Sequence, residues 1–417
     1  MVNLPAEFIA ETRRIMGEER FNRFLGAFDE EAPTSIRVNR SRFSRSEEGG
    51  ARSEITLVPW CEEGYYLADR PQFTFDPLFH AGCYYVQEAS SMFVTHILRT
   101  YLTPHSTLLT PQNTLLVPRF ALDLCAAPGG KSTALRSVLP DDCVLVSNEP
   151  MGNRAQILLE NITKWGAPNC IVTNNYPRDF RKAKLKFDMI LCDVPCSGEG
   201  MFRKDPATIS EWSPQNVEKC WQLQRDIVAD AWECLNPGGL FIYSTCTFNT
   251  KENEENIRWI LENFDAEVLD IPVDPSWNIT GSLLEGFDAP VYRFIPGITR
   301  GEGLFACAMR KRGVRSEECG VRNVMKQIQN LKVISLPTPP SSLHKVDIDN
   351  STALKYLRGE ALVLPPDTPK GIVEITYKGQ KLGQAKNIGN RANNLYPKAW
   401  RIKTTHLPTE EVKIINI

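Results

Sequence analysis

The sequence predicts an α/β protein whose centre is a Rossmann-like, doubly wound parallel sheet. A small α+β module should precede this sheet and a small β-rich domain should follow it. From residue 120 onward, short apolar runs alternate with helical stretches, which is the pattern of a parallel sheet covered by helices. One run leads into a glycine-rich turn and another into a Pro-Cys loop, at the edge where open α/β sheets bind ligands. The 417 residues, 42% apolar and 24% charged, suit a globular chain of two or three domains.

Residues 1–100 predict the α+β module. A helical pattern covers Glu7–Phe28, and Thr34–Asn39 reads as a strand. Shorter strand-like runs follow at Leu57–Trp60 and Tyr65–Leu67. Residues 101–119 are rich in Thr, Pro and Leu, a composition that predicts a loop or insertion.

Residues 120–312 predict the central sheet. Each strand is a short apolar run that is bounded by turn residues, and long helical stretches fill the intervals. The linker at 313–352 should hold one helix between proline-rich ends, and residues 353–417 should form the β-rich domain, with a strand at Gly371–Tyr377. The strands expected in the central sheet are Phe120–Cys125, Cys143–Asn148, Cys170–Asn174, Phe187–Asp193, Leu240–Thr245 and Leu304–Arg310, and two of its helices are Gly152–Trp165 and Val217–Leu235.

Composition excludes several classes of protein. No apolar run is long enough for a membrane span, and the N-terminus lacks the basic start and apolar core of a secretory signal. Several of the twelve cysteines fall in predicted buried strands, which suits a reducing cytoplasm. No cysteine pair has Cys-x-x-Cys spacing and the five histidines are scattered, so we expect no metal site.

Charge is distributed unevenly along the chain. The formal net charge is −2, but residues 353–404 hold ten Lys or Arg against three Asp or Glu, a net of +7. This asymmetry points weakly to a nucleic-acid contact in the C-terminal segment. On charge alone, a solvated basic face is about equally consistent with the pattern.

The first run of the central sheet leads into a glycine turn and then a helix, which presents free backbone N–H groups to a ligand. Gly130-Lys131-Ser132 matches the end of a phosphate-binding P-loop, but Cys125 stands where that motif needs a glycine, and no G-x-G-x-x-G is present. Glu149 ends the second strand, where an acid can accept hydrogen bonds from ribose hydroxyls. These features suit an adenosyl ligand without a pyrophosphate.

Two cysteines and an acid form a second constellation. Cys196 and Cys246 each lie just beyond a predicted strand, whereas Cys125, Cys143, Cys170 and Cys192 fall within predicted strands and read as small core residues. If the two strands are neighbours, both thiols and Asp193 stand over one pocket. A thiolate that adds to carbon 6 of cytosine makes carbon 5 nucleophilic enough to take a methyl group, and an acid near N3 stabilises the charge that develops. The residues alone leave open which thiol attacks.

At these residues the sequence resembles the Sun-type RNA cytosine-5 methyltransferase family, and within it the RsmF-type enzymes of 16S ribosomal RNA. The resemblance covers most of the chain. The matching stretches are Cys125–Lys131, Asn148–Pro150 with Arg154, Asp193–Lys204, Tyr243–Thr247, Glu252–Glu254, Ile36–Asn39, Val58–Trp60 and Val86–Glu88.

The resemblance implies a methyltransferase sheet that binds S-adenosylmethionine, with Glu149 on the ribose. It further implies that Cys246 is the nucleophile, that Cys196 aids release, and that the C-terminal segment is a PUA-like RNA-binding domain. The N-terminal module is similar to the family's RNA-positioning extension. The expected catalytic residues are Cys246, Cys196 and Asp193, and the expected cofactor-binding residues are Cys125, Ala126, Ala127, Pro128, Gly129, Gly130, Lys131, Glu149, Arg154, Asn175 and Asp193.

One stretch departs from the family pattern. Many members carry an aspartate near the adenine after the third strand, but Val172–Pro177 has no acid, so Asn175 or a backbone group is expected there instead.

The function expected is methylation of cytosine carbon 5 in RNA, with 16S ribosomal RNA as the expected substrate and the cytoplasm as the location. The same chemistry on transfer RNA is the first alternative. A catalytically idle RNA-binding factor in ribosome assembly is the second, and the intact cysteine pair argues against it. A DNA methyltransferase is disfavoured because those enzymes use the Pro-Cys thiol and lack a Thr-Cys motif.

Overall fold

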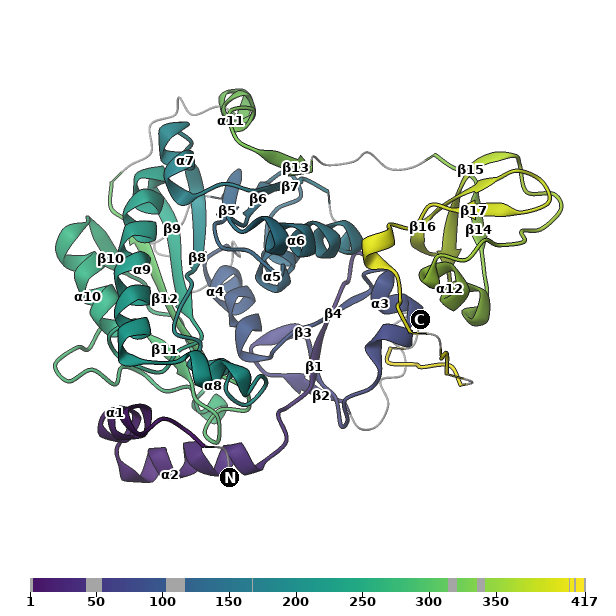
Figure 1. Ribbon diagram of the computed structural model, residues 1–417. Helices are drawn as coiled ribbons and strands as arrows, with labels where there is room; N and C mark the ends of the chain where they lie inside the picture. The colour runs from purple at the N-terminus through teal and green to yellow at the C-terminus, as the bar shows by residue number, and fades with distance from the viewer. Residues whose placement is uncertain are drawn as a thin grey trace.

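The computed structural model describes residues 3–42, 55–102, 117–166, 168–313, 321–335, 342–404, 406–408 and 410–415. A large twisted sheet forms its centre, and two smaller sheets accompany it (Figure 1). The order of the large sheet is β10-β12-β9-β8-β5-β6-β7-β13, and β11 pairs with β12. Its strands are β5 Phe120–Asp123, β6 Val144–Asn148, β7 Cys170–Thr173, β8 Phe187–Asp193, β9 Leu235–Thr245, β10 Ala266–Val268, β11 Tyr292–Phe294, β12 Leu304–Lys311 and β13 Val333–Ser335.

Strands β5 to β9 are parallel, whereas β10, β11, β12 and β13 run antiparallel to their neighbours. The chain moves outward from β5 through β6 to β7 and then returns to β8 on the other side of β5. The strand order therefore reverses between β5 and β8, which is the place where doubly wound sheets bind ligands.

Helices cover both faces of this sheet (Figure 1). One face packs α4, α5 and α6 against a core that includes Leu98, Leu135 and Leu158. The other packs α7, α9, α10 and α11 against a core that includes Phe180 and Trp232. The bounds of these helices are α4 Phe93–Leu102, α5 Gly130–Val138, α6 Gly152–Trp165, α7 Pro177–Lys182, α8 Ala207–Glu211, α9 Pro214–Cys234, α10 Glu254–Asn263 and α11 Val321–Ile328.

The N-terminal part contributes a helix pair and a small antiparallel sheet of order β2-β3-β1-β4. The helix pattern expected over Glu7–Phe28 is broken, because Gly17 has a φ of 73° and separates two helices. The bounds are α1 Ala6–Met16, α2 Glu18–Gly26, β1 Ser35–Val38, β2 Thr56–Val58, β3 Cys61–Tyr66, α3 Pro77–His80 and β4 Tyr84–Val86.

The C-terminal sheet has the order β14-β15-β16-β17 and carries one helix, α12. Its strand β14 precedes Ala353, so this unit begins earlier than the sequence predicts, because β14 is too short to show a pattern. Its elements are β14 Lys345–Asp347, α12 Asn350–Arg358, β15 Gly371–Tyr377, β16 Gln380–Asn387 and β17 Ala392–Asn394. A shared apolar core joins this sheet to the N-terminal one, and it includes Ile36, Leu78, Tyr84, Leu354 and Tyr356.

Two stretches with expected irregular structure lie partly outside the described residues. Of the loop expected at 101–119, residues 103–116 are not described, and of the linker expected at 313–352, residues 314–320 and 336–341 are not described. The linker holds the expected helix, α11, and also β13, which pairs with β7 and which the sequence did not predict. None of the helices in the described part of the chain has the length and apolar character that a membrane crossing needs.

Candidate active site

The two cysteine loops leave neighbouring parallel strands and meet above the sheet edge. Strand β8 ends at Asp193 and leads to Cys196, and β9 ends at Thr245 and leads directly to Cys246. The N–H of Gly200 donates to the carbonyl of Cys246 at 2.7 Å, so the loops touch through their main chains. The two sulfur atoms lie 3.3 Å apart, and both residues are half-buried.

The contact between the thiols affects their protonation. The contact with Cys246 and burial together raise the pKa of Cys196 well above its ordinary value. Cys196 therefore keeps its proton near neutral pH, and either sulfur can be the donor in the contact between the two thiols.

Asp193 is held on two sides at the same edge. Its Oδ2 accepts a hydrogen bond from Nζ of Lys131 at 2.9 Å, and its Oδ1 accepts one from the hydroxyl of Ser244 at 2.7 Å. Burial lowers the pKa of Lys131, but the adjacent carboxylate outweighs burial and the net shift is upward. The pair thus joins the first turn of α5 to the end of β8, where the Cys196 loop begins.

The glycine turn between β5 and α5 contains the stretch expected to bind the cofactor. Gly129 has a φ of 114° and occupies the N-cap of α5, and no side chain caps this helix end. Buried beneath the turn, Asp123 accepts a hydrogen bond from Ser132 at 2.6 Å, and its Oδ1 has no hydrogen-bond partner among the described residues. Burial raises the pKa of Asp123 to about 7. Along the turn lie Cys125, Ala126, Ala127, Pro128, Gly129, Gly130 and Lys131.

Glu149 follows β6, as the sequence predicts, and is buried. Its Oε1 accepts the N–H of Met151 at 2.9 Å, and its Oε2 lies 3.5 Å from the guanidinium of Arg154. Arg154 also donates to the carbonyl of Ala127 at 3.0 Å, so it links the acid to the glycine turn.

Asn175 lies at the same edge, but its side chain is already engaged. Its amide nitrogen donates to the carbonyl of Lys332 at 3.2 Å, and its amide oxygen accepts the N–H of Lys332 at 2.9 Å. These bonds fix the chain that enters β13. Its backbone is engaged as well, because its N–H donates to Oδ1 of Asn148 at 3.0 Å and its carbonyl accepts the side-chain amide of Asn148 at 2.9 Å. Its contact with an adenine therefore stays a prediction.

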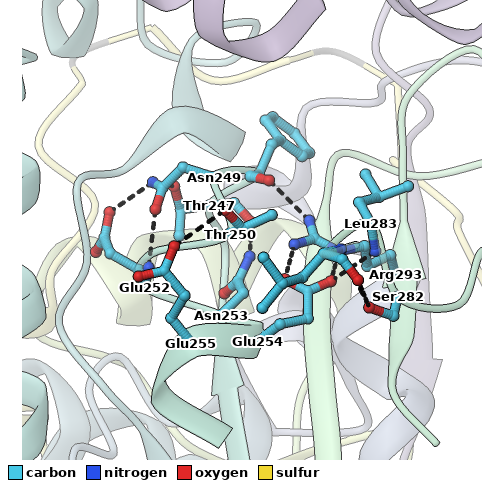
Figure 2. A network of polar contacts seen from close by, with 12 residues as sticks. Thr247, Asn249, Thr250, Glu252, Asn253, Glu254, Glu255, Ser282, Leu283 and Arg293 are labelled. Carbon is cyan, nitrogen blue, oxygen red and sulfur yellow. Dashed lines mark hydrogen bonds and ion pairs between the residues drawn. The ribbon is translucent and has the colours of Figure 1, made fainter. Parts of the chain in front are cut away.

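A buried polar network beside the cysteines was missed by sequence reasoning. Figure 2 shows its part in the loop after β9, where the amide of Asn249 approaches Glu252 and the side chain of Asn253 reaches back to the carbonyl of Thr247. Glu254 forms a two-pronged ion pair with the fully buried Arg293, which also donates to the carbonyl of Phe248 at 2.8 Å. The signal for it was the polar run from Thr247 to Glu255, directly after an apolar strand.

The N-terminal helix pair packs on the cysteine loops. Phe8 of α1 contacts the ring of Phe202 at 5.1 Å between centroids, and Phe24 of α2 contacts Phe248 at 5.1 Å. Phe202 follows the Cys196 loop and Phe248 lies just after Cys246. The helices therefore support both loops from the side away from the sheet (Figure 1).

Three family models match the chain. Residues 4–89 match the N-terminal domain of 16S rRNA methyltransferase RsmF, residues 106–310 match 16S rRNA methyltransferase RsmB/F, and residues 343–402 match the methyltransferase RsmF PUA domain.

Solved structures share the fold. A methyltransferase homolog protein from Pyrococcus horikoshii is 27% identical, with a TM-score of 0.60 over 74% of this chain and 96% of that one. NSun6 from the same organism has a TM-score of 0.59 over 74% of this chain and 99% of that one, and at 19% identity it supports the fold alone.

Two curated relatives of the same name match the chain. Ribosomal RNA small subunit methyltransferase F from Pectobacterium atrosepticum is 35% identical over 75% of this chain, and the match covers 63% of that relative's length, less than two thirds. The protein of the same name from Cronobacter sakazakii is 30% identical over 95% of this chain and 96% of its own. The chain therefore belongs to the family of ribosomal RNA small subunit methyltransferase F.

Proposed function

We propose that this chain transfers a methyl group from S-adenosylmethionine to carbon 5 of a cytosine in 16S ribosomal RNA, through a covalent cysteine adduct at carbon 6. The observation that carries the proposal is the thiol pair. Cys196 and Cys246 lie in loops that follow neighbouring strands, and their sulfur atoms are 3.3 Å apart. Asp193 is the last residue of β8, the strand that leads into the Cys196 loop.

The residues at the switch point fit S-adenosylmethionine. The uncapped N-terminus of α5 favours a carboxylate such as the one on methionine. Glu149 offers a carboxylate to ribose hydroxyls, and Oδ1 of Asp123 is a buried polar atom with no hydrogen-bond partner among the described residues. When bound, the cofactor supplies an electrophilic methyl group, and the chain's own residues must make carbon 5 nucleophilic.

Each protein group then has one role in this scheme. Cys246 adds to carbon 6 as a thiolate, and the new carbon–sulfur bond pushes electrons toward carbon 5. Asp193, in its protonated form, donates that proton to N3 and so neutralises the charge that builds there, while Lys131 and Ser244 hold the carboxyl group in place. After methyl transfer, Cys196 in its thiolate form takes the proton of carbon 5, the bond to Cys246 breaks with that sulfur leaving as a thiolate, and N3 returns its proton to Asp193. The raised pKa of Cys196 makes its thiolate, once formed, a stronger base than that of an ordinary cysteine.

Methyl transfer to RNA tests the proposal directly. Purified protein with radiolabelled S-adenosylmethionine should label unmodified 16S ribosomal RNA, and bisulfite sequencing should find the label at a cytosine. Labelling of transfer RNA alone would favour the first alternative substrate. RNA binding without any labelling would favour an idle assembly factor and overturn the enzymatic proposal. A 16S ribosomal RNA substrate would also place the protein in the cytoplasm with the small ribosomal subunit as its partner.

A further inference from the structure

Two buried carboxylates, one from each cysteine loop, accept hydrogen bonds from the backbone of the opposite loop. Glu199, from the Cys196 loop, accepts the main-chain N–H of Phe248 at 2.6 Å and of Asn249 at 3.1 Å. In return, Glu252 from the Cys246 loop accepts the main-chain N–H of Ser197 at 3.0 Å. Each loop therefore supplies the acid that satisfies the other loop's backbone, next to its cysteine.

Asn249 ties the two carboxylates together. Its amide nitrogen donates to Oε1 of Glu199 at 3.0 Å and to Oε1 of Glu252 at 2.8 Å. Gln224 of α9 donates to Glu252 at 2.7 Å and to the carbonyl of Pro195 at 2.9 Å. We call Glu199, Asn249 and Glu252 the loop clasp. Its two acids are at most 2% exposed.

The hydrogen bonds of the loop clasp depend on the charge of its two carboxylates as well as on their shape. Every contact named for its acids comes from an N–H donor, so an ionised carboxylate satisfies all of them at once. Burying two such acids side by side is costly: burial and the neighbouring Glu199 raise the pKa of Glu252 to about 7. A neutral amide of the same shape would keep one oxygen for these donors but would turn its NH2 group toward the donors on the other side.

The two cysteine loops are also in close contact, which limits how far either can move relative to the other. A Cβ at Gly200 would lie 2.4 Å from the carbonyl oxygen of Cys246. The hydroxyls of Ser197 and Thr247 lie 3.0 Å apart across the same seam. A shift of either loop would therefore change the distance between the two sulfur atoms.

We propose that Glu199 and Glu252 are positioning residues whose carboxylates hold the Cys196 and Cys246 thiols within reach of one base. They touch no reacting atom and act through the loop backbones. The predicted effect on the rate of methylation rests on the proposed function, because only a reaction that uses two thiols needs both sulfur atoms near the same cytosine.

The first test needs no RNA. The full chain is equilibrated with reduced and oxidised glutathione, and the Cys196–Cys246 disulfide is quantified by peptide mass spectrometry. Two protein thiols become one disulfide while oxidised glutathione takes up both electrons and both protons as two reduced molecules. Glu252→Gln and Glu199→Gln should each lower the effective concentration of the thiol pair by about tenfold or more, the scale of one lost charge-assisted hydrogen bond.

A matched variant controls for charge loss in the same segment. Glu255 lies in the first turn of α10, three residues after Glu252, and accepts one long hydrogen bond, from Thr250 at 3.4 Å. Glu255→Gln should therefore leave the disulfide equilibrium unchanged. If a glutamine variant at the clasp fails to fold, Glu252→Asp keeps the charge and shortens the reach, and it should lower the same equilibrium.

The second test is steady-state methylation of 16S ribosomal RNA. The clasp variants should lose kcat by about tenfold or more while KM for RNA and cofactor stays near that of the wild type, since no binding group is removed. Clasp variants with wild-type disulfide equilibrium and wild-type kcat would overturn the inference. If the wild type itself does not methylate RNA, the proposed function fails, while the glutathione equilibrium still decides whether the clasp positions the thiols.

Discussion

Glu149 is the residue on which cofactor affinity should depend most clearly. Glu149→Gln keeps an oxygen to accept the N–H of Met151, which lies 2.9 Å away, so the loop should stay in place. It removes the charge that would accept the ribose hydroxyls. Calorimetric titration with S-adenosylmethionine should show affinity reduced by about 1.5–3 kcal/mol.

A control for this substitution lies on the following helix. Glu160 is paired with Lys164 on α6, and Glu160→Gln should leave cofactor affinity as it is. Equal affinity of Glu149→Gln and the wild type would remove Glu149 from the cofactor site.

A site residue could be predicted from the sequence where its place in the site depends on its position at the end of one strand. Cys196 and Cys246 stood out because each follows an apolar run, and adjacent parallel strands bring such positions together. Glu199 and Glu252 could not be found in this way. Both lie in stretches that resemble the family, but the sequence gives them no role, because their partners are main-chain groups of a loop about fifty residues away.

At the scale of elements, buried strands and long helices were predictable because burial imposes a simple pattern. The strands Phe187–Asp193 and Gly371–Tyr377 and the helix Gly152–Trp165 have the predicted bounds. Strand β9 begins at Leu235 rather than at Leu240, because Pro237 and the glycines after it read as a turn.

Elements that depend on distant partners were not predictable. Strand β13 is three residues long and pairs irregularly with β7, so no local pattern marks it. The helix pair α1 and α2 shows a helical pattern, but its role depends on Phe8 and Phe24 meeting aromatic rings of the cysteine loops. Residues 1–100 therefore support the candidate active site as well as any RNA contact.

At the scale of the molecule, the N-terminal and C-terminal sheets share one core. Deleting the C-terminal unit would expose residues such as Ile36 and Leu78, so charge substitution is the cleaner test of RNA binding. Lys386, Arg391 and Lys398 are exposed on the C-terminal unit. Replacing all three with Gln should weaken RNA binding. The plot of log affinity against log salt falls with rising salt, and its slope should become less steep by about 2.

Loss of charge elsewhere provides the control for this prediction. Lys182, Lys184 and Lys219 are exposed on or near α7 and α9, away from the C-terminal sheet (Figure 1). Replacing these three with Gln removes the same charge and should leave the salt slope nearer to that of the wild type. Equal slopes in the two triple variants would show that the basic C-terminal face is only solvated.

The account's central claim is a covalent reaction in which the two thiols act in sequence. It is tested most directly by incubating Cys196→Ala and Cys246→Ala with S-adenosylmethionine and unmodified 16S ribosomal RNA, followed by denaturing gel electrophoresis. Cys196→Ala should attack and methylate the base but release it poorly, so a protein–RNA adduct should accumulate. Cys246→Ala and the double variant should form no adduct, because the attacking thiol is gone. An adduct with Cys246→Ala and none with Cys196→Ala would reverse the roles, and active single variants without any adduct would contradict the covalent mechanism.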